Sequence, residues 1–241
     1  MVPAMAKQDT KQPFTGFPKG GVEFFQTLSV RQDRAWFHAH KTDYQELWES
    51  PMHAFLDAVQ AKTATLFPET KKSKSKVFRI YRDVRFSKDK SPFKTSISGV
   101  IPLYQGGMME RVGYYFELGP TPFVAAGRWM MDPPTLKRFR KAVADERTGP
   151  PFAAAVEKAV AKDFVVSSQQ QLARVPKPWT KDHPRAELLR HKGFTFTLPN
   201  PSFALLQSPK LVDWAVTQLK AIAPVMKWVE LAARGKKPTF K

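Results

Sequence analysis

The sequence predicts an α+β fold in which an antiparallel β-meander packs against helices from the N-terminal and C-terminal parts of the chain. Apolar residues recur with a helical period before residue 68 and after residue 132, and with a period of two between these points. The alternating segments are joined by short connections, which suit antiparallel strands because parallel strands need long crossovers. With 241 residues and 42% hydrophobic content, the chain can bury one large core. We therefore expect one domain over residues 14–233, a disordered tail over 1–13 and a basic tail over 234–241.

The N-terminal part predicts three helices. Asp33 is suited to cap the second helix, and Pro51 fits the first turn of the third, which runs to about Phe67. Residues 70–76 form a lysine–serine run without an apolar anchor, so we expect an exposed loop there. The side chains that recur at helical spacing, and that we expect to face the core or a neighbouring helix, are Phe24, Phe25, Leu28, Trp36, Phe37, His40, Tyr44, Leu47 and Trp48.

The central part predicts four strands. In residues 77–86 the side chains alternate, so that one face carries Phe78, Ile80, Arg82, Val84 and Phe86 and the other carries Arg79, Tyr81, Asp83 and Arg85. This pattern predicts a strand with one mostly apolar face and one ionic face. Further alternating segments at 93–103, 112–118 and 123–129 complete the meander.

The C-terminal part predicts helices and two short strands. Proline pairs open two of the helices, and proline also marks the start of the last one. The expected elements are helices over 133–146, 150–164 and near 184–191, strands over 171–175 and 194–198, and a closing amphipathic helix from about Pro209 with a kink at Pro224.

The charge of the chain is strongly positive and unevenly distributed. Lys and Arg number 39 against 21 Asp and Glu, a formal net charge of +18. Residues 71–94 hold ten basic and two acidic residues, and residues 234–241 hold four basic residues and no acid. Such a balance favours anionic partners, which include nucleic acid, phosphorylated metabolites and acidic membrane surfaces.

The absence of cysteine excludes disulfides, thiolate nucleophiles and cysteine-based metal sites. We find no secretory leader pattern and no apolar run long enough for a membrane span, and therefore expect a cytoplasmic protein.

Several motifs resemble one family. The longest is residues 79–94, Arg-Ile-Tyr-Arg-Asp-Val-Arg-Phe-Ser-Lys-Asp-Lys-Ser-Pro-Phe-Lys. The others, in order, are residues 34–37 with Lys41 and Tyr44, then 113–115, 126–129, 182–184 and 188–194. Together they resemble the bacterial and fungal family called domain of unknown function 2461, although the family commonly has Asn-Arg where this chain has Asp33-Arg34. The resemblance covers about residues 17–196; it implies a single domain and carries no catalytic role.

The ionic face of segment 77–86 and the turn after it form the candidate ligand site. Bidentate guanidinium groups suit carboxylate and phosphate, and a neighbouring carboxylate and phenol can orient the arginines and donate a hydrogen bond. We expect this site to bind a small anionic metabolite through Arg79, Tyr81, Asp83, Arg85, Ser87, Lys88, Lys90 and Lys94. The competing interpretation is a structural ladder of ion pairs covered by the N-terminal helices. Arg82 interrupts the apolar face, so it must reach the sheet edge or pair with a carboxylate such as Glu117, Asp132 or Asp145.

Two other functions remain open from the sequence. The lysine-rich loop 71–76 and the basic tail favour binding of nucleic acid regardless of sequence, and the charged face also suits a non-catalytic interaction module. His38 and His40 point to different sides of a helix and cannot share a metal ion, so we predict no metal site there. The sequence names no cofactor, no catalytic residue and no oligomeric state, and leaves open whether the chain is an enzyme.

Overall fold

The computed structural model describes residues 13–107, 110–167 and 171–240. The predicted tail over 1–13 therefore lies outside the described residues, apart from Pro13. The described elements are helices α1 (Gly21–Val30), α2 (Arg34–Ala39), α3 (Lys41–Tyr44) and α4 (Ser50–Thr63), a π-helical turn (Gln45–Glu49) and a 3-10 turn (Pro68–Lys72), strands β1 (Lys76–Val77), β2 (Ile97–Pro102), β3 (Gly113–Leu118) and β4 (Phe123–Arg128), helices α5 (Pro133–Ala144) and α6 (Gly149–Val160), strand β5 (Val165–Val166), helix α7 (Ala186–Leu189), strand β6 (Phe194–Thr197), and helices α8 (Phe203–Leu206) and α9 (Lys210–Ala233).

The predicted α+β class and antiparallel meander are confirmed. The strands form one sheet in the order β1-β2-β3-β4-β6-β5, and each neighbouring pair is antiparallel. Strands β1 to β4 follow one another in sequence and in space, as short connections require. Helix α5 begins at the predicted proline pair, where Asp132 accepts a hydrogen bond from the Thr135 backbone N–H (3.0 Å). Helix α9 continues through Pro224.

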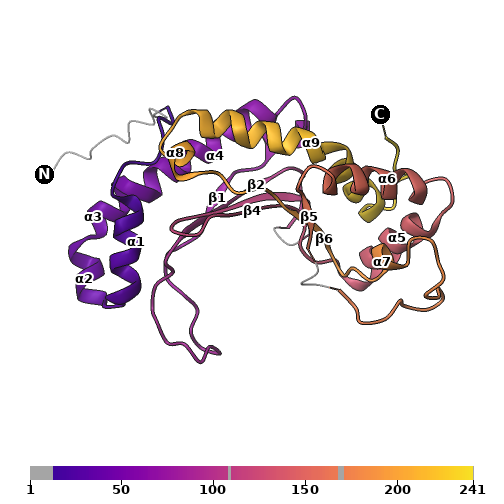
Figure 1. Cartoon of the computed structure of the whole chain (residues 1–241), viewed down its shortest axis with the longest axis horizontal. Coiled ribbons are helices and arrows are strands. Elements are labelled where there is room, and N and C mark those ends of the chain that lie inside the picture. Colours follow the sequence, from indigo (N-terminus) through magenta and orange to yellow (C-terminus); the bar gives the residue numbers. More distant parts are fainter. Residues whose placement is uncertain (1–12, 108–109, 168–170, 241) are drawn as a thin grey trace, which may run out of the picture.

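One face of the sheet carries the core. Tyr114, Phe116 and Leu118 of β3 are fully buried on this face. The ring of Phe116 lies 4.9 Å from that of Phe55 in α4, and the Tyr114 hydroxyl donates to the Ala215 carbonyl of α9 (3.1 Å). Figure 1 shows α4 and α9 running along this side of the sheet, with α5 and α6 at the far end of α9. The strands therefore bury alternate residues against these helices, as the period of two requires.

The predicted strand over residues 77–86 is wrong beyond Val77. After β1 the chain leaves the sheet as an extended loop over residues 78–95, which we call the arm; it is the purple loop that reaches below the sheet in Figure 1. Its two sides are joined by a bridge between Tyr81 and Phe93 and by hydrogen bonds from Arg82 N to Pro92 O (2.9 Å) and from Lys94 N to Ile80 O (2.8 Å). The two sides of the arm thus pair with each other for a short distance instead of extending the sheet.

Local polar contacts explain why the arm is not a regular strand. Asp83 accepts a hydrogen bond from the Arg85 backbone N–H (3.3 Å), and Asp89 accepts from both the backbone N–H (2.9 Å) and the hydroxyl (2.6 Å) of Ser91. Side chains that bind nearby backbone in this way compete with a β-ladder and favour turns. The alternation of apolar and charged residues in 77–86 therefore does not specify a strand.

Smaller boundary errors occur elsewhere. The segment predicted as a strand over 171–175 makes only a bridge between Gln171 and His191 among its described residues. Helix α6 ends at Val160, before the predicted end at Phe164, and the short β5 that follows was not predicted. Within the described residues, no helix is long and apolar enough to cross a membrane.

Candidate functional site

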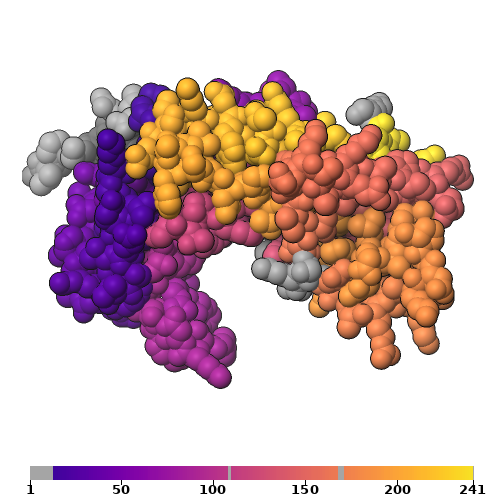
Figure 2. Space-filling view, in the orientation of Figure 1, coloured from indigo at the N-terminus to yellow at the C-terminus, as the bar shows by residue number. Residues whose placement is uncertain are grey.

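The second face of the sheet carries no helix from the part of the chain that the structure describes. Tyr115 and Glu117 of β3 point away from the core and are half-buried, and Phe123 at the start of β4 is 36% exposed. In Figure 2 the molecule is hollowed on this side, between the arm and the orange segment 171–192. We call this surface, carrying Phe78, Tyr115, Glu117 and Phe123, the open face. A sheet face without a covering helix is available to a partner.

A row of aromatic rings crosses the open face. The ring of Tyr115 lies 6.2 Å from the ring of Phe78 at the base of the arm and 6.2 Å from the ring of Phe123. The ammonium groups of Lys76 and Lys94 lie 5.4 Å and 5.7 Å from the centre of the Phe78 ring. The Tyr115 ring is tilted by 55° to the Phe78 ring and by 59° to the Phe123 ring, so the three rings offer separate stacking surfaces beside the cations and not one continuous platform.

A small hydrogen-bonded cluster lies beside this row. The Glu117 carboxylate accepts hydrogen bonds from the Tyr115 hydroxyl (2.7 Å) and from the Ser96 hydroxyl (2.9 Å). Burial raises the pKa of Tyr115, and its hydrogen bond to Glu117 adds to that shift. Burial also lowers the pKa of Lys94, although the nearby Glu117 carboxylate opposes that shift. The carboxylate is thus held by two hydroxyls, which fixes the Tyr115 ring in the row.

The arm places the predicted site residues on an exposed surface. Arg79, Asp83, Arg85, Lys88 and Lys90 are exposed. Tyr81 is 48% exposed, Ser87 is half-buried, and Lys94 is half-buried at the base of the arm. The interpretation in which helices cover a buried ion-pair ladder is therefore wrong, because the charged side of the arm faces solvent.

The ion pairs of the arm are local. The Arg85 guanidinium donates two hydrogen bonds to the Asp83 carboxylate, at 3.0 Å from Nε and 2.7 Å from Nη2, and these bonds lower the pKa of Asp83. Arg82 pairs with Asp89 on the other side of the arm, and not with any of the three carboxylates that the sequence suggested. The Lys90 ammonium donates to the Val84 carbonyl (2.9 Å). The arm keeps an excess of exposed cations after this pairing.

Contacts with the N-terminal helices hold the base of the arm in place. The Phe37 ring of α2 lies 4.4 Å from the Phe93 ring and 6.0 Å from the Tyr81 ring. The Phe93 backbone N–H donates to the Gln32 side-chain oxygen (3.0 Å). The tip has no comparable support, since Phe86 is 96% exposed. The arm therefore projects from a fixed base beside the open face.

The other basic segments are arranged differently. Lys71, Lys72, Lys74 and Lys76 are exposed, as expected for the loop, although residues 68–72 form a 3-10 turn. In the predicted tail, Arg234 binds both oxygens of Glu69, with its Nη1 and Nη2 atoms each 3.0 Å from one of them. Pro238 is buried. Part of this segment therefore packs on the body of the protein.

The described residues contain no group of three or more histidine, cysteine, aspartate or glutamate side chains placed to hold a metal ion. The His40 ring stacks on the Trp36 ring with 4.2 Å between centres, and its Nδ1 lies 2.8 Å from the Trp36 carbonyl oxygen. His191 is 5% exposed, and burial lowers its pKa. His40 is thus held by contacts with Trp36, and His191 is buried within the fold.

With the fold and this geometry established, comparison with known families is informative. The profile of the family described as "Conserved hypothetical protein (DUF2461)" matches residues 21–228. The chain belongs to this family. The DUF2461 match runs from the start of α1 into the last turns of α9, so it includes the whole sheet, the arm and the open face. The comparisons with curated proteins and with solved structures each gave no match.

Sequence reasoning did not identify the open face. Tyr115, Glu117 and Phe123 were assigned to strands without a role in a site. Their alternation with the buried residues of β3 and β4 was a usable signal, because it predicts that they share the face opposite Tyr114 and Phe116. What the sequence lacked was the information that no element among the described residues covers that face.

Proposed function

We propose that this protein binds single-stranded nucleic acid across the open face, with bases on the aromatic row and phosphates at the cations of the arm. The observation that carries the proposal is the row Phe78–Tyr115–Phe123, which lies at the base of a projecting basic arm. Proteins that bind single strands regardless of sequence combine aromatic stacking surfaces with a positively charged path for the backbone.

The arm suits a chain of phosphates better than one small anion. Arg79, Arg85 and Lys88 are exposed and spread along an extended loop, so they offer several separate points of contact. A small metabolite would need these groups to converge in a cavity, and arm residues line neither the cavity of about 540 Å³ between α1 and the helices that follow it nor the cavity of about 200 Å³ at the end of α9. The orange segment 171–192, which Figure 2 shows on the other side of the hollow, also contains the exposed cations Arg174, Lys177 and Lys181. A strand that crosses the open face would therefore meet cations at both edges.

Fluorescence anisotropy with labelled oligothymidylate and oligouridylate tests this proposal. We expect the logarithm of affinity to fall linearly with the logarithm of salt concentration, by about 0.7 for each phosphate that is neutralised. The double variant Arg79→Gln/Arg85→Gln should reduce this slope by about 1.4. The matched control is Lys210→Gln/Lys220→Gln, which removes two exposed cations from α9 on the covered side of the sheet and should leave the slope unchanged.

The same assay separates a polymer from a small ligand. If a mononucleotide or inorganic phosphate competes with the oligonucleotide at equal concentration of phosphate groups, the arm binds single anions and the proposal is overturned. Absence of oligonucleotide binding at low salt would also overturn it. Weak competition by the mononucleotide, with retained binding of the longer strand, is the expected result because several contacts then act together.

A further inference from the structure

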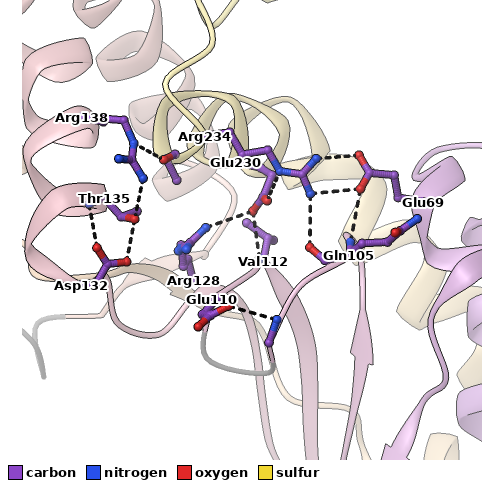
Figure 3. A network of polar contacts seen from close by, with 12 residues as sticks. Glu69, Gln105, Glu110, Val112, Arg128, Asp132, Thr135, Arg138, Glu230 and Arg234 are labelled. Atoms are coloured by element: carbon purple, nitrogen blue, oxygen red, sulfur yellow. Dashed lines mark hydrogen bonds and ion pairs between the residues drawn. The ribbon is translucent and has the colours of Figure 1, made fainter.

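A second charged region lies at the C-terminal end of α9, away from the arm. There the end of β4, the start of α5, the loop after β2 and the last turns of α9 line a cavity of about 200 Å³ that opens to solvent. Its lining includes Arg128, Arg138 and Arg234 together with Glu110, Asp132 and Glu230, as Figure 3 shows. We call it the Arg128 pocket.

The acidic groups of the pocket already have partners. Glu230, 2% exposed, accepts hydrogen bonds from the Val112 backbone N–H (3.1 Å) and from Arg234 Nε (2.7 Å). Asp132 accepts from the backbone N–H (3.0 Å) and hydroxyl (2.7 Å) of Thr135, where it caps α5. Glu110 accepts from the Gly107 backbone N–H (3.3 Å).

Arg128 is different, because it is buried without adequate acceptors. It is 5% exposed, and its Nη1 lies 3.6 Å from the Glu230 carboxylate, beyond ordinary hydrogen-bond distance. Its buried Nε finds no hydrogen-bond partner among the described residues. A guanidinium carries five donors and stays charged in proteins, and buried donors are nearly always paired. A bound group with an oxygen acceptor would therefore complete the hydrogen bonding of this side chain.

The neighbouring arginines limit where that acceptor can bind. Arg234 already donates three hydrogen bonds to Glu69 and Glu230 and one to the Gln105 carbonyl (3.3 Å). Arg138 donates from Nε to the Ala233 carbonyl (2.8 Å) and from Nη2 to the Thr135 hydroxyl (2.8 Å), which fixes its guanidinium at the pocket wall. Arg128 and Arg138 thus line one cavity from two different elements, β4 and α5. Burial lowers the pKa of Arg128, and the Glu230 carboxylate opposes this shift only in part.

We propose that the Arg128 pocket binds a small molecule through a carboxylate or phosphate group, with Arg128 as the main donor and Arg138 as a second one. An oxyanion supplies the acceptor that Arg128 lacks, and planar guanidinium groups recognise such groups in a bidentate manner. A cavity of about 200 Å³ has room for a small oxyanion such as inorganic phosphate or a short dicarboxylate. This site is independent of the arm and of the open face.

The test is an NMR titration that observes the Nε–Hε group of Arg128 directly. Inorganic phosphate and malonate are added in turn while sodium chloride keeps the ionic strength constant. We expect the Arg128 Nε–Hε resonance to shift and to saturate, with a Kd of about 1 mM or tighter for one of the two probes. A shift that stays linear with both probes, or no shift, would overturn the proposal.

Variants identify the residues. Arg128→Lys keeps the charge but removes Nε and the planar fork, so binding followed by calorimetry should weaken about 10-fold or more. If this variant does not fold, Arg138→Gln serves instead, because Arg138 is exposed; it should weaken binding about 5-fold. Unchanged affinity in the folded variant would contradict the assignment. Arg79→Gln/Arg85→Gln should retain the pocket's affinity, so that failure at the arm and failure at the pocket are distinguishable.

Discussion

The arm and the Arg128 pocket are both rich in arginine, and they use it in opposite ways. In the arm, Arg82 and Arg85 each pair with an aspartate a few residues away and remain in contact with solvent. In the pocket, Arg128 is buried and poorly paired, and the carboxylate next to it comes from a helix about one hundred residues later in the chain. Exposed pairs are weak and exchange partners readily, whereas a buried charge that loses its partner is costly. The arm is therefore suited to bind and release a large anion, and the pocket to hold a specific small one.

The largest effect should come from Glu230. Glu230→Gln removes the carboxylate that faces both Arg128 and Arg234, and leaves Arg128 buried without a counter-ion. We expect a loss of about 3 kcal/mol or more in the free energy of unfolding, measured by urea denaturation. Glu69→Gln is the matched control, since its pair with Arg234 is about one-third exposed and should contribute less than about 1 kcal/mol. Equal losses of unfolding free energy in the two variants would show that the buried pair of Glu230 stabilises the fold no more than the partly exposed pair of Glu69.

The next effect concerns the open face. Phe123→Ala removes the outermost ring of the aromatic row without entering the core, because Phe123 is 36% exposed. Oligonucleotide affinity should fall about 5-fold or more, since stacking of one base contributes about 1–3 kcal/mol. The control is Phe203→Ala, which removes a 50% exposed ring from α8 on the other side of the sheet. If both variants bind like the wild type, the aromatic row is not the contact surface.

The sequence predicted the sheet well because residues 113–118 and 123–128 alternate between a face buried against helices and the opposite face. An apolar period of two indicates this kind of one-sided burial. The same pattern misled at residues 78–86, where Asp83 and Asp89 bind nearby backbone and turn the chain. The sequence placed a turn only after Phe86, whereas the structure already has a turn at residues 85–86.

The pocket was not predictable in the same way. Val112 and Glu230 are hydrogen-bonded although they are 118 positions apart in the sequence. From its local sequence, Arg128 is an ordinary residue at the end of a strand, and its pairing with Glu230 depends on how α9 packs. Long-range contacts of this kind depend on how helices pack, which local patterns do not encode. The structure places Arg79, Asp83 and Arg85 on an exposed arm and not on the sheet face that the sequence predicted. Whether the candidate residues form a site stays a prediction.

A smaller effect is expected from pH. Hydrogen bonds from Ser91 and Arg82 lower the pKa of Asp89 to about 2. A carboxyl whose folded pKa is depressed stabilises the folded arm above its ordinary pKa, and that contribution is lost as pH falls from about 4 towards 2. Carbon-detected NMR of the Asp89 carboxyl should therefore show a midpoint near 2. A midpoint for Asp89 near 4 would show that the contacts with Ser91 and Arg82 do not persist in solution.

The smallest effect should come from Asp83. Asp83→Asn removes the carboxylate that competes with phosphate for Arg85. Oligonucleotide affinity should rise about 2- to 3-fold at low salt, because Arg85 is then free to bind phosphate. The rise is small because an exposed ion pair such as Asp83–Arg85 is weak. The melting temperature should not change measurably. A fall in affinity would mean that Asp83 orients Arg85 for its ligand, as the sequence first suggested.

Photo-crosslinking tests the central claim, that the open face and the arm form the nucleic-acid interface, most directly. A bromouracil-substituted oligonucleotide is irradiated with the protein, and the crosslinked peptides are identified by mass spectrometry. The account predicts crosslinks at Phe78, Tyr115 or Phe123, which are suppressed at high salt. Crosslinks confined to the helices on the covered side of the sheet, or none at low salt, would contradict it.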